Sequence, residues 1–260
     1  MNKVIVQKFG GTSVQDADTR GMALTHVERA LSRGCQVVMV VSAMGRAGAP
    51  YATDSLLNLV GGKDSALAPR ELDQLAGVGE ILSMTVMLNE ARKRGLKAVG
   101  LTGPQAGVRT DNDYQNARIR RVDPAPLTAA LKQADLVVVC GFQGQSEEGY
   151  LTTLGRGGSD TSAVALGAAL KAAYVDIFTD VEGVMTGDPR EDKDARLIPF
   201  LTYSKMEEMA LNGAKVVHPR AVQLAAQADL PLRVRATTQL DAGNWTVIGN
   251  RNFFEKVEVI

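Results

Sequence analysis

The chain has 260 residues, of which 45% are apolar, and it carries 29 basic and 29 acidic side chains, so its net charge at pH 7 is zero. A neutral chain with only 5% aromatic residues argues against nucleic acids and anionic membranes as partners, because these are bound by basic patches or stacking rings. The sequence has no signal peptide and no apolar run long enough to span a bilayer, so we expect a cytoplasmic protein.

Apolar runs and helix-forming segments alternate along the chain. The run 36–42 is almost entirely Val and Met, which is typical of a parallel strand covered on both faces. In 71–94, apolar residues recur at three- and four-residue steps, which predicts a long amphipathic helix. The predicted strands are 4–9, 36–42, 97–101, 136–140, 174–179, 232–235 and 246–248. The predicted helices are 19–33, one that opens with capping by Thr53 and Asp54, 71–94, 123–134, 163–173, 205–212 and 221–228.

This alternation predicts an α/β fold, in which helices cover a mostly parallel sheet. Ligands bind at the carboxyl ends of the strands in such sheets. Five of the predicted strands end in glycine-rich or polar residues, which favours a binding site at that edge. These strand ends are 8–13, 42–45, 102–103, 141–142 and 179–180.

The stretch 154–163 carries the strongest local signal for a ligand. Gly155, Gly157 and Gly158 allow a sharp turn, and residues of N-cap type follow them before an Ala- and Leu-rich run. A glycine turn that leads into a helix N-terminus suits an anion, and Arg156 adds a forked cation for a carboxylate or phosphate. The alternative is a turn that does no more than start a helix.

Lys8 stands inside an apolar strand, directly before Gly10 and Gly11. A buried ammonium is costly unless an anion meets it, and beside two glycines we expect a phosphate. The alternative is a lysine that extends from the strand end into solvent. The order of lysine and glycines excludes a Walker A loop, and the glycine spacing excludes a Rossmann fingerprint.

Cys35 and Cys140 lie inside or beside apolar runs, so we expect buried free thiols. The chain has two histidines and no Cys/His cluster, which argues against a zinc site, and we predict no set of metal ligands.

Six motifs, in order along the chain, resemble those of aspartokinases in the amino acid kinase family. They are Lys8-Phe9-Gly10-Gly11-Thr12-Ser13, Ser42-Ala43-Met44-Gly45, Gly155-Arg156-Gly157-Gly158-Ser159-Asp160-Thr161, Thr179-Asp180-Val181-Glu182-Gly183, Thr186-Gly187-Asp188-Pro189-Arg190 and Gly213-Ala214-Lys215-Val216-Val217-His218-Pro219. The resemblance implies a three-layer αβα sandwich in one domain, 1–250. An acceptor-binding lobe would span about 1–170, a nucleotide-binding lobe 171–250, and a tail 251–260.

The resemblance also implies roles for individual residues, with Lys8 and Asp160 as catalytic residues and ATP and Mg²⁺ as cofactors. The acceptor would be bound by Ser42, Thr53, Glu80, Arg156, Gly157, Gly158 and Ser159. The nucleotide would be bound by Lys8, Gly10, Gly11, Thr12, Thr179, Asp180, Met185, Thr186, Asp188, Arg190 and Lys215. Family members often have Tyr at the position of Met185, where adenine would pack on a thioether instead. Glu80 as a solvated helix residue and Asp180 as a turn residue are the alternatives.

The implied reaction is transfer of the γ-phosphoryl group of ATP to the side-chain carboxylate of L-aspartate, the first step toward lysine, threonine and methionine. A carboxylate is already ionised at neutral pH, so no catalytic His or Cys is needed. Glu80 suits the ammonium of aspartate and Arg156 its unreactive carboxylate. Two alternatives stay open, namely another small carboxylate as acceptor and a non-catalytic nucleotide-binding partner with this fold.

Aspartokinases usually continue into ACT regulatory domains, whereas this sequence ends at Ile260. We therefore expect hyperbolic kinetics for aspartate and insensitivity to lysine, threonine and methionine, unless a separate regulatory subunit joins the chain. The alternative is that the sequence is part of a longer protein and ends at a domain border. A homodimer is the expected assembly.

Overall fold

The computed structural model describes residues 3–187, 192–214, 216–240 and 244–253. Its main sheet has eight strands in the order β10-β12-β11-β9-β1-β2-β6-β3. In chain order these are β1 (Lys3–Phe9), β2 (Cys35–Val41), β3 (Ala98–Leu101), β6 (Leu136–Cys140), β9 (Val175–Thr179), β10 (Phe200–Leu201), β11 (Leu232–Ala236) and β12 (Thr246–Ile248). All neighbouring strands are parallel except β11 and β12, so the sheet is mostly parallel, as predicted.

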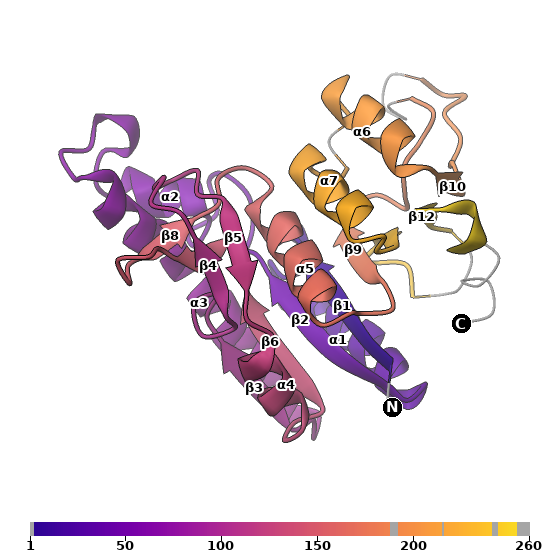
Figure 1. Ribbon diagram of the computed structural model, residues 1–260, viewed down its shortest axis with the longest axis horizontal. Helices are drawn as coiled ribbons and strands as arrows, with labels where there is room; N and C mark the ends of the chain where they lie inside the picture. Colours follow the sequence, from indigo (N-terminus) through magenta and orange to yellow (C-terminus); the bar gives the residue numbers. More distant parts are fainter. Residues whose placement is uncertain (1–2, 188–191, 215, 241–243, 254–260) are drawn as a thin grey trace.

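Helices cover both faces of this sheet, and the side chains of β2 show why. Val38 and Val40 pack in one apolar cluster with α5 (Gly158–Ala169) and α7 (Pro219–Gln227). Val37 and Met39 pack in a second cluster with α1 (Ala17–Ser32) and α3 (Pro69–Lys93). In Figure 1, α5 lies in front of the strands and α1 behind them. The remaining α-helices are α2 (Thr53–Asn58), α4 (Ala125–Leu131) and α6 (Tyr203–Leu211). The three-layer α/β prediction is confirmed.

A second, four-stranded sheet was not predicted, and it lies at the left of Figure 1. Its strand order is β5-β4-β7-β8, with β4 (Val108–Thr110), β5 (Ile119–Val122), β7 (Gln143–Gln145) and β8 (Leu151–Thr153). These strands are three or four residues long and rich in Arg, Gln, Thr and Gly, so they lack the apolar pattern that identifies a strand.

The start of α5 and the capping of α2 differ from the prediction. α5 begins at Gly158 rather than at residue 163, because Gly157 takes a φ of 70° and serves as N-cap. α2 begins at Thr53 but its N-cap is Ala52, without a side-chain hydrogen bond, so the predicted capping by Thr53 and Asp54 is wrong. Cys35 and Cys140 are buried free thiols, as expected. Among the described residues, no helix is both long and apolar enough to cross a membrane.

Candidate active site

Lys8 and Asp160 form an ion pair where β1 approaches the first turn of α5. Lys8 Nζ lies 2.8 Å from Asp160 Oδ1, and the two side chains are 12% and 11% exposed. The backbone N–H of His218 donates to Asp160 Oδ2 at 3.3 Å. A carboxylate is also favoured in the first turn of a helix, where the dipole is positive. The predicted anion beside Lys8 is therefore supplied, in this structure, by the chain itself, and the reading of Lys8 as a solvated strand-end lysine is wrong.

Gly11, after β1, allows the backbone of its loop to contact the backbone of the loop after β2. The short 3₁₀ helix η1 (Gly11–Ser13) follows Gly10 directly. A Cβ atom on Gly11 would lie 2.3 Å from the carbonyl oxygen of Gly45, and the N–H of Gly45 donates to the Gly11 carbonyl at 2.9 Å. Gly10 N–H donates to the Phe178 carbonyl at 3.4 Å, which joins this loop to the end of β9. Gly10, Gly11 and Thr12 thus lie between the ends of β2 and β9.

The loop before α5 also has no room for side chains at its contacts with neighbouring segments. A Cβ atom on Gly157 would lie 2.1 Å from Cγ of His218, and one on Gly141 would lie 2.9 Å from Cβ of Ser159. Side chains at these glycines would prevent β6, α5 and His218 from meeting. Arg156, in contrast, is exposed and has no hydrogen-bond or ion-pair partner among the described residues. Its guanidinium is available to a ligand.

Glu80 lies in the middle of α3 and is only 2% exposed. Its Oε1 accepts the backbone N–H of Ala43 at 3.0 Å, directly after the end of β2, and Oε2 has no partner among the described residues. Burial raises the pKa of this carboxyl group from 4.5 to about 8. A solvated role for Glu80 is therefore wrong. Gly79 permits the approach, because a Cβ atom there would lie 2.6 Å from Cβ of Ala43.

Two further acceptor residues lie around this loop. Ser42 donates its backbone N–H to the Phe9 carbonyl at 3.2 Å, which fixes it beside the end of β1. Thr53 is the first residue of α2, and α2 packs on α3. Glu80 accepts the N–H of the peptide that follows Ser42, which places Ser42 beside it. Among the described residues, no hydrogen bond or ion pair links the Thr53 side chain to Glu80 or Ser42.

The predicted nucleotide residues lie at and beyond the end of β9. Thr179 Oγ1 donates to Asp180 Oδ1 at 3.0 Å, and Asp180 Oδ2 accepts from Arg46 Nη2 at 2.6 Å. Met185 forms an isolated antiparallel bridge with Leu197, and Thr186 Oγ1 accepts the N–H of Arg196 at 3.0 Å. Asp188, Arg190 and Lys215 lie outside the described residues.

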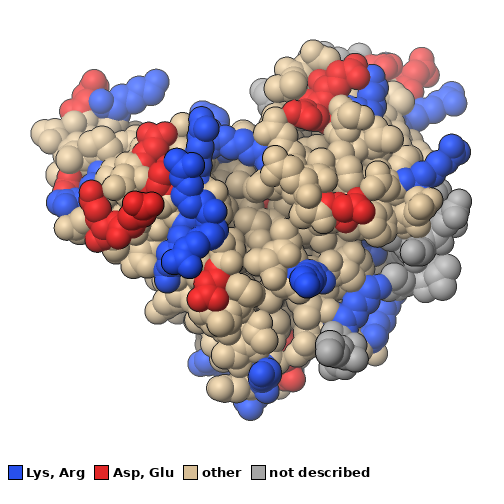
Figure 2. Space-filling model, in the orientation of Figure 1, with Lys and Arg blue, Asp and Glu red and all other residues tan. Residues whose placement is uncertain are grey.

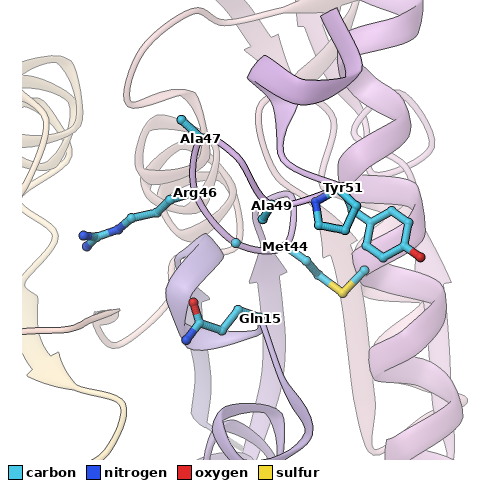
Figure 3. A pocket seen from close by; sticks show the side chains of 8 residues that line it. Gln15, Met44, Arg46, Ala47, Ala49 and Tyr51 are labelled. Atoms are coloured by element: carbon cyan, nitrogen blue, oxygen red, sulfur yellow. The ribbon is translucent and has the colours of Figure 1, made fainter. Parts of the chain in front are cut away.

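Sequence reasoning missed Arg46, which links the loop after β2 to the loop after β9. Figure 3 shows its side chain pointing away from Met44 and Tyr51, at one side of a cavity of about 300 Å³. No role was predicted for Arg46, because an arginine in an exposed loop carries no local signal for a long-range ion pair.

Sequence reasoning also missed a set of contacts that supports the segment 10–13 after β1. Thr237 Oγ1 donates to Ser13 Oγ at 2.6 Å, and the Thr237 carbonyl lies 3.0 Å from His26 Nε2. The His26 ring packs on Phe178 with centroids 4.4 Å apart, and Phe178 stacks on Phe9 at 4.5 Å. Phe9 and Phe178 are the residues just before the two loops of the site, so this stack fixes where those loops begin.

Comparison with known proteins gives the same picture. Residues 3–236 match the model of the amino acid kinase family. Aspartokinase 1 of Bacillus subtilis is 54% identical over 93% of this chain and 60% of its own length, and the aspartokinase of Geobacillus stearothermophilus is 45% identical over 92% and 58%. The chain thus spans about 60% of the length of these curated relatives.

Solved structures agree. Aspartate kinase from Synechocystis superposes with a TM-score of 0.80 at 38% identity, covering 95% of this chain and 40% of that one. Escherichia coli aspartokinase III in complex with aspartate and ADP gives a TM-score of 0.79 at 28% identity, covering 95% and 65%. UMP kinase from Ureaplasma parvum, at 14% identity and a TM-score of 0.66, shares the fold alone. With nearly all of its length matched by the family model, this chain belongs to the amino acid kinase family.

Proposed function

We propose that the chain is an aspartate kinase, which transfers the γ-phosphoryl group of ATP to the side-chain carboxylate of L-aspartate and forms 4-phospho-L-aspartate. The observation that carries this proposal is the buried carboxyl group of Glu80, whose Oε2 has no partner among the described residues. A buried carboxylate is costly unless a cation meets it, and the ammonium of a free amino acid is such a cation. The names of the relatives point to the same acceptor.

The charges around Glu80 match those of aspartate. Glu80 would hold the ammonium, and the unpaired guanidinium of Arg156 would hold the carboxylate that does not react. Ser42, beside the end of β1, would lie near the reacting carboxylate, and Thr53, Gly157, Gly158 and Ser159 would complete the pocket. An N-acylated acceptor fits less well, because an acylated nitrogen offers no ammonium to Glu80.

On the donor side, the proposed catalytic groups are Lys8 and the backbone N–H groups of Gly11 and Thr12, because the N–H of Gly10 already donates to the Phe178 carbonyl. The aspartate carboxylate oxygen attacks the γ-phosphorus, the bond to the bridging oxygen of the β-phosphate breaks, and ADP leaves. Little proton chemistry is involved, so catalysis comes from positioning and from stabilising the charge that develops on the phosphoryl oxygens. Asp160 would hold Lys8 in place before ATP arrives, as their 2.8 Å ion pair indicates.

ATP would enter with Mg²⁺ bound to its phosphates. Mg²⁺ is usually held by substrate phosphates, water and one or two carboxylates rather than by an all-protein cage. Within the described part of the chain, no group of three or more His, Cys, Asp or Glu side chains could hold a metal ion. The nucleotide would lie against Thr179, Asp180, Met185 and Thr186, with Asp188, Arg190 and Lys215 as further contacts.

The division of the chain into two lobes and its assembly are part of this proposal. The acceptor would bind mainly to residues of 1–170 and the nucleotide mainly to 171–250, so the two substrates would meet between β1 and α5. We further propose a cytoplasmic homodimer, which a regulatory subunit can join.

The test is an acyl-phosphate assay with hydroxylamine as trap. The purified chain is supplied with ATP, Mg²⁺ and, in separate reactions, aspartate, N-acetylaspartate, glutamate and N-acetylglutamate. Aspartyl hydroxamate should form, and it should depend on Mg²⁺. If an N-acetylated acid gives product and aspartate gives none, the N-acetylated acid is the acceptor in place of aspartate. ATP binding without any hydroxamate would support a non-catalytic role.

A further inference from the structure

The second sheet carries a cavity of about 360 Å³ that is separate from the loops of the candidate active site. It is lined by residues of β4, β5 and β7 and of the turn after β7, among them Arg109, Arg120 and Arg121. Figure 2 shows basic side chains gathered in a band over β4 and β5, on a protein whose net charge is zero. The positive charge is therefore concentrated locally, and the strand pairing explains how.

The pairing of β4 with β5 places these arginines together. Arg109 pairs directly with Arg121, and the next pair is Thr110 with Ile119, so Arg120 is the extra residue of a β-bulge. A bulge re-aims side chains, and here the consecutive residues Arg120 and Arg121 line the same cavity. Like charges placed directly opposite each other on neighbouring strands destabilise a sheet. The bulge therefore concentrates positive charge at a cost in stability.

Other groups of the chain neutralise this charge only in part. Arg109 donates to the carbonyl oxygen of Pro104 at 3.0 Å, and Arg120 lies 3.1 Å from Asp111 while 63% of its side chain stays exposed. Arg121 has no hydrogen-bond or ion-pair partner in the described ranges. Glu147 also lines the cavity but forms no ion pair with the arginines among these residues. Three guanidinium groups thus face one pocket that holds a single acidic side chain.

We propose that this cavity binds a small polyanion with at least two carboxylate or phosphate groups. Guanidinium forks match both groups in bidentate geometry, and the volume is in the range of small-molecule sites. The anion would neutralise the opposed pair Arg109 and Arg121. The cavity lies on the same sheet as β8, and β8 leads into the segment that contains Gly155 and Arg156.

The test is isothermal titration calorimetry of the whole chain at low salt, with citrate as a carboxylate probe and pyrophosphate as a phosphate probe. The variants are Arg121→Gln and the double variant Arg120→Gln/Arg121→Gln. Arg118→Gln, an exposed arginine two residues away that does not line the cavity, is the matched control. We expect the wild-type chain to bind at least one probe saturably, and the probe whose affinity depends more strongly on the cavity arginines identifies the anion class.

The double variant should bind at least about tenfold more weakly, since two charge-assisted contacts are lost, whereas Arg118→Gln should stay within about twofold. Lys8→Ala should leave the binding that depends on Arg120 and Arg121 unchanged. This result distinguishes the cavity from the site at Lys8. Without any probe, Arg121→Gln should raise Tm by about 1–3 °C because a like-charge pair is removed. No saturable binding of either probe by the wild-type chain, or equal losses in the cavity and control variants, would overturn the proposal.

Discussion

Replacing Glu80 by Gln tests the proposed amino-acid site with the smallest change of shape. The amide oxygen of Gln can still accept the N–H of Ala43, which Glu80 Oε1 accepts at 3.0 Å, while the negative charge disappears. A charge-assisted hydrogen bond is worth about 1.5–3 kcal/mol, so the KM for aspartate should rise roughly tenfold to a hundredfold. The KM for ATP should not change, because the side-chain hydrogen bond of Glu80 among the described residues goes to Ala43, which is not a predicted nucleotide residue.

The pH dependence makes this prediction sharper. Burial raises the pKa of Glu80 to about 8, so the empty enzyme holds a proton there at neutral pH. An ammonium ligand pairs with the ionised form, so the apparent affinity for aspartate should weaken up to about tenfold per pH unit below 8. In Glu80→Gln this dependence should vanish.

Stability gives a second readout with the opposite trend. Between pH 4.5 and about 8 the unfolded chain has released the Glu80 proton and the folded chain has not, so stability should fall as pH rises, by at most about 1.4 kcal/mol per pH unit. In Glu80→Gln, the decrease of Tm with rising pH should be smaller than in the wild-type chain. Glu71→Gln, on the same helix but paired with Arg70 near the surface, is the control and should change neither KM nor slope. An unchanged KM and pH profile in Glu80→Gln would refute the assignment, and an equal loss of ATP affinity would show that α3 itself is disturbed.

Three further substitutions test the proposed catalytic lysine, the glycine turn before α5 and a buried ion pair. Lys8→Ala should lower kcat roughly 10²–10³-fold, or about 3–4 kcal/mol, in steady-state assays, and an unchanged kcat would remove Lys8 from the chemistry. Gly157→Ala should reduce both Tm and activity, because Gly157 has a φ of 70° and a new Cβ would lie 2.1 Å from the His218 ring; a wild-type Tm would contradict this. Asp176→Asn weakens a buried bidentate pair with Arg233, at 2.6 and 2.8 Å, and should destabilise the fold by about 3–5 kcal/mol in urea unfolding, whereas a loss below about 1 kcal/mol would show that the pair is replaceable.

The main sheet was predictable because its strands are defined by local composition. The run 36–42 corresponds to β2 within one residue, since a strand buried on both faces must be apolar throughout. The small sheet was not predictable, because β7 is only Gln143–Gln145 and is defined by its pairing with β8 rather than by its own residues. Short strands of this kind depend on tertiary contacts.

The candidate site divides in the same way. Lys8 and the glycines of 155–158 were predictable, because a cation in an apolar strand and a glycine turn each require a local explanation. The link from Ser13 to Thr237 joins residues 224 positions apart and has no local signal. The carboxylate partner of Lys8 was assigned a role only through a family resemblance, and the 2.8 Å ion pair gives that assignment its geometry.

Phosphorus NMR of the complete reaction detects the proposed acyl-phosphate product itself. The chain is mixed with ATP, Mg²⁺ and L-aspartate, and the spectrum is followed with time. We predict a new acyl-phosphate resonance that grows together with ADP, is absent without aspartate and is strongly reduced in Lys8→Ala. Release of ADP and inorganic phosphate with no acyl phosphate, at a rate that does not depend on aspartate, would contradict it.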